Sequence, residues 1–247
     1  MTDRRIDIGS LSVSLASPCV MGIINCTPDS FYSPSRVQEG EVLAVAERMV
    51  ADGAAILDIG GCSTRPGYTP VEEEEEWRRV EPALRMIRKA MPEVVLSLDT
   101  YRVEVAHRAL DTFGEMIIND VSGGDEQMYG LVKAYDVPYI ITGRPVPEVH
   151  GYDKWIEDPG LGFLGSTEAD YAALRSLRRG DYPLLVGLSR KSMIYRTLGI
   201  TPEESLTPTQ ALHMYALTHG ADILRVHDVL PAVQTVRMFT MLDKKTQ

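Results

Sequence analysis

Short apolar runs alternate with amphipathic stretches from one end of the chain to the other. Buried parallel strands have the first form because both faces are covered, and helices packed on a sheet have the second. The alternation therefore predicts repeated strand and helix units. Eight apolar runs are predicted to be strands, at residues 20–24, 55–59, 94–98, 116–118, 138–141, 155–157, 184–186 and 223–226.

The clearest helical pattern lies at residues 71–90, where Trp77, Val80 and Leu84 share one face. The acidic run at residues 72–76 opens this segment, and negative charge there is favoured by the helix dipole. We expect this run to be a solvated helix start without a functional role. Further helices are predicted at residues 39–51, 103–112, 127–135, 167–179, 208–218 and 231–242.

One interval breaks the alternation, because only 13 residues separate Ile141 from Trp155. Gly143, Pro145 and the other glycine and proline residues of this interval disfavour a crossover helix. The chain of 247 residues has the length of one closed α/β barrel. We therefore predict a single domain over residues 1–247, an α/β fold of the (β/α)₈ TIM barrel type that lacks the helix between strands five and six. Such a barrel would have an uncovered flank near Thr142 to Lys154.

The charge and the cysteines restrict the partners and the compartment. A net charge of −10 disfavours nucleic acid and anionic membranes as partners. The N-terminus has no apolar signal segment, and nowhere do 18 apolar residues run together. Cys19, Cys26 and Cys62 are odd in number and lack C-x-x-C spacing, which indicates thiols rather than a disulfide framework or a metal site. We expect a cytoplasmic protein.

Polar residues gather directly after the predicted strands. The carboxyl ends of all strands in a parallel barrel open on one face, so these side chains are expected to share one pocket. Asp99, Asn119 and Asp158 can hydrogen-bond a planar nitrogen heterocycle, since a carboxylate binds an N–C–N edge through both oxygens. A second, cationic group suits phosphate. Its members are Arg65, Arg190, Lys191, Arg225 and His227.

Seven motifs, in order along nearly the whole chain, resemble those of the dihydropteroate synthases. Residues 21–31 read M-G-I-I-N-C-T-P-D-S-F, and residues 58–67 read D-I-G-G-C-S-T-R-P-G. The others are S-L-D-T, I-N-D-V-S-G-G, D-P-G-L-G-F, G-L-S-R-K-S and R-V-H-D-V, which begin at residues 97, 118, 158, 187 and 225. The resemblance implies a Mg²⁺-dependent transferase of folate biosynthesis. It would condense 6-hydroxymethyl-7,8-dihydropterin pyrophosphate with 4-aminobenzoate, giving 7,8-dihydropteroate and pyrophosphate, as a homodimer that sulfonamides inhibit.

The resemblance also implies roles for the matching residues. Asn25, Asp99, Lys191, Arg225 and His227 would be catalytic, with Asn25 holding Mg²⁺. Asp99, Asn119, Asp158 and Lys191 would bind the pterin beside Phe163, and Arg65, Arg225 and His227 the diphosphate. The remaining residues of the substrate-binding set would be Thr27, Phe31, Thr64, Pro66, Gly162, Arg190 and Ser192. The chemistry implied is cleavage of the carbon–oxygen bond at the pterin methylene, followed by capture of the pterin cation by the arylamine.

Three places depart from the pattern of these enzymes. Residues 140–145 read I-I-T-G-R-P, where a Met-His-Met type stretch would contribute a methionine beside the pterin. Ser33 stands where the first loop often has a second acidic residue, and residues 162–166 read G-F-L-G-S in place of G-F-G-K-T. We expect altered pterin contacts beside the fifth strand.

Two other functions compete with the synthase. A non-catalytic pterin-binding paralogue would accommodate the lost helix but has no use for the phosphate-binding cations. A methyltetrahydrofolate-binding methyltransferase domain would share the barrel, but such domains lack the S-T-R-P-G loop and the R-V-H ending. The cations, the S-T-R-P-G loop and the R-V-H ending therefore favour the synthase.

Some polar residues have structural interpretations. Asp58 lies inside the second predicted strand and is interpreted as a buried group that bonds the Arg65 loop. Asp120 and Asp228 fit either a loop cap or a ligand. The histidines that match no motif are expected to be surface or packed residues: His107, His150, His213 and His219.

Overall fold

The computed structural model describes residues 4–26, 37–62 and 71–243. Eight strands form one sheet with all neighbouring strands parallel, in the order β8-β7-β6-β5-β4-β3-β10-β9. They are β3 (Cys19–Asn25), β4 (Ile56–Gly60), β5 (Val95–Asp99), β6 (Ile117–Asp120), β7 (Tyr139–Thr142), β8 (Trp155–Asp158), β9 (Leu185–Val186) and β10 (Ile223–Val226). A parallel bridge between Glu157 and Leu184 joins the last strands of the row and closes the sheet into a barrel.

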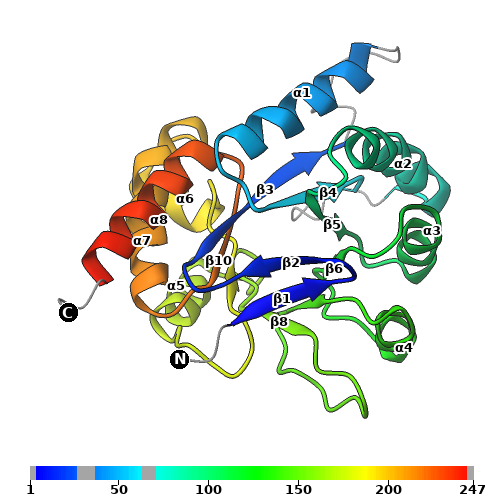
Figure 1. Cartoon of the computed structure of the whole chain (residues 1–247). Coiled ribbons are helices and arrows are strands. Elements are labelled where there is room, and N and C mark those ends of the chain that lie inside the picture. The colour runs from blue at the N-terminus through cyan, green and yellow to red at the C-terminus, as the bar shows by residue number, and fades with distance from the viewer. Residues whose placement is uncertain (1–3, 27–36, 63–70, 244–247) are drawn as a thin grey trace.

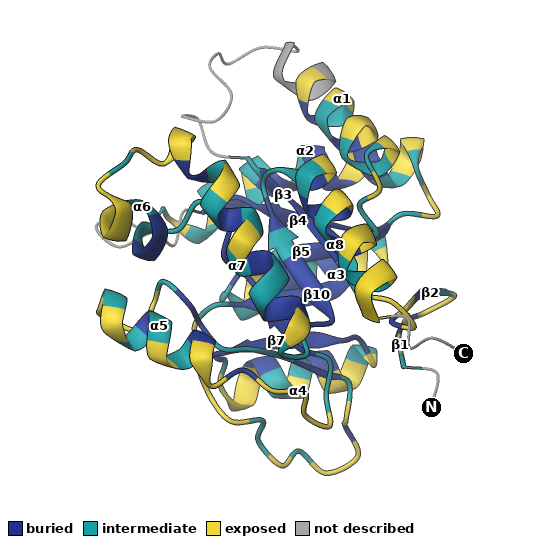
Figure 2. Cartoon of the chain, turned by 90° about the vertical axis from the view of Figure 1, so that its left-hand side faces the viewer, coloured by how far each residue is buried: buried dark blue, intermediate teal, exposed yellow. Residues whose placement is uncertain are grey.

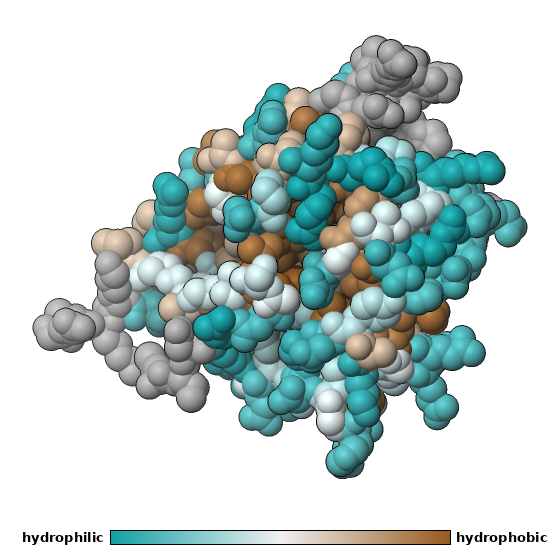
Figure 3. All heavy atoms as spheres, turned by 45° about the vertical axis from the view of Figure 1, so that its right-hand side comes forward, coloured by the Kyte–Doolittle hydropathy of each residue, from teal (hydrophilic) through white to brown (hydrophobic). Residues whose placement is uncertain are grey.

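Helices surround the barrel (Figure 1), and Figure 2 shows buried strands enclosed by helices with exposed outer faces. The helical elements are α1 (Val37–Ala51), α2 (Glu73–Ala90), α3 (Val103–Phe113), α4 (Glu126–Tyr135), α5 (Thr167–Arg175), α6 (Ser192–Leu198), η1 (Glu203–Ser205), α7 (Leu206–Thr218) and α8 (Val229–Asp243). The predicted barrel is confirmed. Within the described ranges, no helix has the length and apolar character needed to cross a membrane. On the face shown in Figure 3, hydrophilic side chains predominate, in keeping with the high net charge.

An N-terminal hairpin, β1 (Arg5–Ile8) and β2 (Leu11–Ser14), was not predicted from the sequence. Its side chains alternate between exposed and buried, and Ile6, Ile8 and Val13 pack against residues at the start of the barrel strands. The hairpin therefore closes the N-terminal end of the barrel. The opposite end, where the strands finish, stays available for a site.

The acidic start of α2 is not solvated throughout, so that part of our expectation was wrong. Glu76 is fully buried and forms an ion pair with Arg102, whereas Glu72 and Glu74 are exposed. The reason is helical periodicity, because Glu76 lies one turn before buried Val80 on the inward face. A negative charge thus lies beneath the helix layer, beside the carboxyl end of β5.

The flank that lacks a helix is covered by the connecting segment itself. Residues 143–154 form no helix, as predicted. Tyr152 is buried and meets Trp155 edge to face at 4.9 Å between ring centroids. Trp155 in turn packs edge to face on Tyr129 and Tyr139. The Tyr152 hydroxyl donates to the carbonyl of Val137 at 2.7 Å. The flank that we expected to be bare therefore has an aromatic cover.

Replacing Tyr152 by alanine tests this cover. The variant should lose about 3–4 kcal/mol of unfolding free energy, because it removes a buried aromatic side chain and leaves a cavity. Tyr152→Phe keeps the ring and should lose only about 1 kcal/mol, the contribution of one hydrogen bond. Urea unfolding followed by circular dichroism would measure both values. Equal small losses would show that the ring does not support the flank.

Candidate active site

One pocket at the carboxyl ends of the strands gathers five of the polar residues that the motifs predicted. Asp99, Asn119 and Asp158 come from β5, β6 and β8, and Arg225 comes from β10. Lys191 reaches the pocket from the segment between β9 and α6. The complete lining is Asp99, Asn119, Val121, Thr142, Asp158, Phe163, Gly187, Lys191 and Arg225. Residues far apart in the sequence therefore share one cavity, as the sequence predicted.

Asp58 accepts hydrogen bonds from two residues that line this pocket and from Ser97. Its Oδ2 accepts from the Arg225 Nε at 2.6 Å and from the Asn119 Nδ2 at 3.1 Å. Its Oδ1 accepts from the Ser97 hydroxyl at 2.6 Å. The Arg225 Nη2 also donates to the Asp99 Oδ2 at 2.5 Å. Asp58 is buried, as predicted, and two of these partners, Asn119 and Arg225, line the pocket.

The acidic groups of the pocket are held in an environment that favours their protonated form. Burial raises the pKa of Asp99 to about 7, and the negative charges of Asp58 and Glu76 add to this rise, while Arg225 opposes it. Burial also raises the pKa of Asp158, against the opposing charge of Lys191. The two carboxyl groups therefore titrate closer to neutrality than ordinary aspartates.

The basic groups respond to the same burial in different ways. Burial lowers the pKa of Lys191 to about 8, although the charge of Asp158 opposes this shift. Burial also acts to lower the pKa of Arg225, but the charges of Asp58 and Asp99 outweigh it and raise the pKa. Arg225 is thus a permanent cation, whereas Lys191 can lose its proton near physiological pH.

The Lys191 side chain is fixed by contacts at the pocket mouth. Its Nζ donates to the carbonyl of Leu161 and lies 4.7 Å from the ring centroid of Phe163, a cation–π contact. Gly162 has a left-handed φ of 86°, and an added Cβ there would come within 2.7 Å of the Lys191 Cδ. A side chain at Gly162 would thus displace the lysine. Phe163 itself is 41% exposed, which leaves an aromatic face at the opening.

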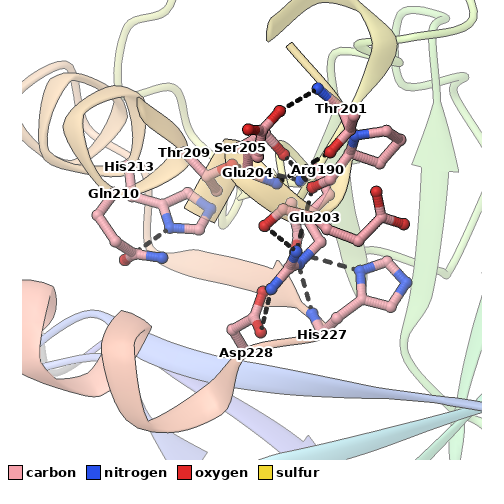
Figure 4. Close-up of polar contacts among 12 residues, drawn as sticks. Arg190, Thr201, Glu203, Glu204, Ser205, Thr209, Gln210, His213, His227 and Asp228 are labelled. Atoms are coloured by element: carbon pink, nitrogen blue, oxygen red, sulfur yellow. Dashed lines mark hydrogen bonds and ion pairs between the residues drawn. The ribbon is translucent and has the colours of Figure 1, made fainter. Parts of the chain in front are cut away.

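Two further cations of the predicted phosphate-binding group, Arg190 and His227, do not line this pocket. The His227 ring lies beside Ser189, whose hydroxyl oxygen is 3.1 Å from the Nδ1 atom. Arg190 forms an ion pair with Asp228 and is not part of the pocket lining (Figure 4). Asp120 caps its own loop, because its carboxylate accepts from the Ser122 N–H at 2.7 Å. Asp120 and Asp228 therefore both make structural contacts.

The comparison with known proteins decides the family. A family model described as pterin binding enzyme matches residues 21–150 and 148–227, which together are most of the chain. This protein belongs to the pterin-binding enzyme family.

Bacterial dihydropteroate synthases are among its relatives in this family. The chain is 37% identical to dihydropteroate synthase of Streptococcus pyogenes, with 90% of this chain and 95% of the relative covered. It is also 37% identical to the enzyme of Bacillus subtilis, with 91% and 87% covered. The structure of Xanthomonas albilineans dihydropteroate synthase with 4-aminobenzoic acid superposes with a TM-score of 0.88 at 34% identity, covering 99% of this chain and all of that one.

Three residues that line the pocket were not predicted as site residues from the sequence. Thr142 is buried at the end of β7, within the stretch where the motif resemblance implied a methionine beside the pterin. Val121 and Gly187 directly follow a strand, and that position is the signal that would have found them. The wall of the pocket next to β7 therefore carries a small polar side chain.

Other predicted residues of the family site lie at its edge or outside the described part of the chain. Asn25 is half-buried at the end of β3, and Ser192 is half-buried at the start of α6. Five predicted ligands fall outside the described residues: Thr27, Phe31, Thr64, Arg65 and Pro66. Ser33 lies outside them as well.

Proposed function

We propose that this protein catalyses the dihydropteroate synthase reaction with a single domain formed by residues 1–247. The substrates would be 6-hydroxymethyl-7,8-dihydropterin pyrophosphate and 4-aminobenzoate, and the products 7,8-dihydropteroate and pyrophosphate. The observation that carries the proposal is the pocket in which Asp99, Asn119 and Asp158 lie beside Lys191 and Arg225. Family membership supports it, because the chain matches the synthase of Streptococcus pyogenes over 95% of that protein's length.

The side chains of the pocket divide the work between binding and charge stabilisation. The two aspartates and Asn119 offer acceptors and donors to the pterin edge. When the carbon–oxygen bond at the pterin methylene breaks, its electron pair leaves with pyrophosphate, and positive charge spreads over the pterin. The arylamine nitrogen of 4-aminobenzoate then forms the new carbon–nitrogen bond and releases a proton to solvent. Arg225 and His227 would stabilise the charge that builds on the departing diphosphate.

Mg²⁺ is part of the proposal, with Asn25 as its protein ligand. The described residues contain no group of three or more His, Cys, Asp or Glu side chains arranged to hold a metal. Mg²⁺ commonly keeps several waters and binds through one or two protein oxygens together with substrate phosphates. An amide oxygen at the end of β3 fits that mode of binding. Bound there, the ion would supply positive charge that stabilises the leaving diphosphate.

Release of pyrophosphate from the purified protein tests the proposal directly. We expect release only when the pterin diphosphate, 4-aminobenzoate and Mg²⁺ are all present, and a sulfonamide should compete with 4-aminobenzoate. Omission of each component in turn is the matched control. Calorimetry that detected pterin binding by a well-folded protein without any turnover would reject the synthase in favour of a non-catalytic paralogue.

The titration of the pocket predicts a bell-shaped pH dependence of kcat/KM. Asp99 must be ionised to accept two hydrogen bonds, so activity should rise as pH increases through about 7. Lys191 must keep its proton to act as a cation, so activity should fall as pH increases through about 8. The maximum is therefore expected between these values. In Lys191→Arg, which stays charged, the alkaline decline should disappear; an unchanged decline would exclude Lys191 as its source.

We propose that the protein is a homodimer. Large apolar side chains are exposed on α8 at Leu230, Met238, Met241 and Leu242. Exposed apolar groups of this kind are typical of interfaces between subunits. Light scattering coupled to size-exclusion chromatography should give the mass of two chains. The double variant Met238→Glu, Met241→Glu should give the mass of one, and a monomeric unmodified protein would contradict the proposal.

We also propose a cytoplasmic location. Cys19 and Cys26 are free thiols, and burial raises the pKa of each to about 12. Free thiols are typical of proteins in reducing compartments. Cell fractionation should recover the protein with cytoplasmic markers, and recovery with an exported fraction would contradict this.

A further inference from the structure

Two chain segments that enter the active site are tied to each other by their neighbouring residues. Arg190 immediately precedes Lys191, and Asp228 immediately follows His227. The Arg190 Nε donates to the Asp228 Oδ2 at 2.8 Å, and the Nη2 donates to the Oδ1 at 2.9 Å. This pair is bidentate, the geometry in which arginine and carboxylate are held most rigidly. Figure 4 shows Asp228 facing the guanidinium group, with His227 alongside.

The Nη1 of Arg190 is also occupied by protein groups. It donates to the carbonyl of Pro202 at 3.1 Å and to that of Glu203 at 2.9 Å, at the start of η1. Four N–H donations are thereby used within the protein. Arg225, by contrast, lines the pocket. The motif order suggested Arg190 as a substrate ligand, but its contacts connect three segments of the chain instead.

The backbone at Arg190 needs such support. Its φ of 53° is in the left-handed region, which side chains other than glycine rarely adopt. The turn at this residue separates the directions of two neighbouring side chains: Arg190 contacts Asp228, while Lys191 lines the pocket. A strained conformation of this kind persists only where the surroundings hold it.

Ser189 adds a second tie between the same segments and fixes the ring of His227. The hydroxyl oxygen of Ser189 accepts from the backbone N–H of His227 at 3.1 Å. The His227 Nδ1 lies 3.1 Å from the same oxygen. Because that oxygen already accepts from the backbone, its own proton can be given to Nδ1. Neutral His227 then carries its proton on Nε2, the nitrogen that faces away from Ser189.

We propose that Ser189, Arg190 and Asp228 form a brace that holds Lys191 and His227 in register, so that Arg190 is a positioning residue and not a ligand of the substrate. This inference rests on the proposed function, because it concerns the diphosphate end of the same site. It assigns to Arg190 a role different from that of the other cations. The brace acts on Lys191 and His227 because Arg190 and Asp228 are their immediate neighbours in the chain.

A double-mutant cycle separates the two roles of Arg190. Arg190→Gly keeps the left-handed backbone without strain and removes the ion pair, and Asp228→Asn weakens the same pair from the other side. Each single variant should lower kcat/KM about 10- to 100-fold, the scale of a small misplacement of catalytic groups. The kcat/KM of the double variant should be no lower than that of Arg190→Gly, because both changes remove the same ion pair. If the fold losses in kcat/KM of the two single variants multiplied in the double variant, the brace would be overturned and Arg190 would be a direct ligand.

Arg190→Lys gives an independent outcome. Lysine keeps the positive charge but cannot form the bidentate contact and reach both carbonyl groups. It should therefore behave like Arg190→Gly. Full activity in Arg190→Lys would show that only the charge is needed, which contradicts the brace.

The ring nitrogens of His227 report the Ser189 contact without any turnover. In ¹⁵N-labelled protein above the pKa of the ring, the shifts should show Nε2 protonated and Nδ1 unprotonated. Ser189→Ala should mix the two tautomers and weaken the binding of inorganic pyrophosphate, while Ser189→Thr should restore both properties. A spectrum unchanged in Ser189→Ala would remove Ser189 from the brace.

Asp136 provides a matched control. It is also a non-glycine residue with a φ of 53°, and its carboxylate pairs with Lys154 at 2.8 Å. It lies at the other end of the barrel, before β7, so Asp136→Ala should leave kcat/KM and pyrophosphate binding unchanged.

The nitrogen spectra and the pyrophosphate titrations use protein without substrate, so they test the brace even if turnover is absent. Absent turnover rejects the proposed function, and an additive cycle in an active enzyme rejects the brace alone.

Discussion

Lys191→Ala should lower kcat/KM by about 10³-fold while the protein stays folded. A charged group preorganised in a partly closed pocket commonly contributes about 10²- to 10³-fold to the rate. The fold should tolerate the change because burial lowers the pKa of Lys191 to about 8, which shows that its charge is poorly solvated there. Asp99→Ala should have a comparable effect on turnover. Initial rates and a thermal melt of each variant measure the two properties separately.

Lys154→Ala is the matched control for the lysine. Its ammonium group pairs with Asp136 at 2.8 Å, at the N-terminal end of the barrel. Turnover should therefore stay within twofold of the unmodified protein. If Lys191→Ala also kept turnover within tenfold, the chemistry would not depend on this pocket.

Arg225→Met should have the largest effect on stability, a loss of about 3–5 kcal/mol of unfolding free energy. The reason is that the carboxylates of Asp58 and Asp99 would remain buried after losing the cation that both contact. Activity should be lost as well, because Arg225 lines the pocket. Arg179→Met is the matched control: Arg179 is 56% exposed, and its partner Asp222 keeps a second partner in Arg4, so we expect about 1 kcal/mol or less.

The loss of unfolding free energy in Arg225→Met should grow as pH rises. The pKa of Asp99 in the folded protein, about 7, is above the value of about 3.9 expected for the unfolded chain. Between these values the folded state holds a proton that the unfolded state has released, so this group's contribution to stability falls as pH rises. Without Arg225 the pKa of Asp99 rises further, and the fall should continue above pH 7. A deficit in Arg225→Met that did not grow from pH 5 to pH 8 would contradict the assigned charges.

Much of the fold was predictable because barrel strands are short, apolar and regularly spaced. The strand predicted at residues 223–226 coincides with β10, and the absence of a helix between β7 and β8 followed from the prolines and glycines of that interval. The hairpin of β1 and β2 escaped prediction because its strands are not continuous apolar runs like those of the barrel. In each of these two strands, apolar and polar residues alternate. Helix α6 escaped it because seven residues are too few to show a periodic pattern.

The candidate site was predictable at the level of residues but not of contacts. Position directly after a predicted strand was enough to identify Asp99, Asn119 and Asp158, which the structure places at the carboxyl ends of β5, β6 and β8. Nothing in the sequence shows that Arg190 turns to Asp228 while Lys191 enters the pocket, because this depends on a left-handed φ at a non-glycine residue. The interior position of Glu76 was missed for another reason: it lies one turn before Val80 on the inward face, but the charges around it resembled a solvated helix start.

Product analysis of a single turnover tests the central claim most directly. Protein in excess over the pterin diphosphate, with 4-aminobenzoate and Mg²⁺ present, should convert it to 7,8-dihydropteroate and pyrophosphate in equal amounts, as measured by chromatography and mass spectrometry. The same mixture with Lys191→Ala should return nearly all of the substrate over that time. Recovery of intact pterin diphosphate from the unmodified, folded protein would contradict the account.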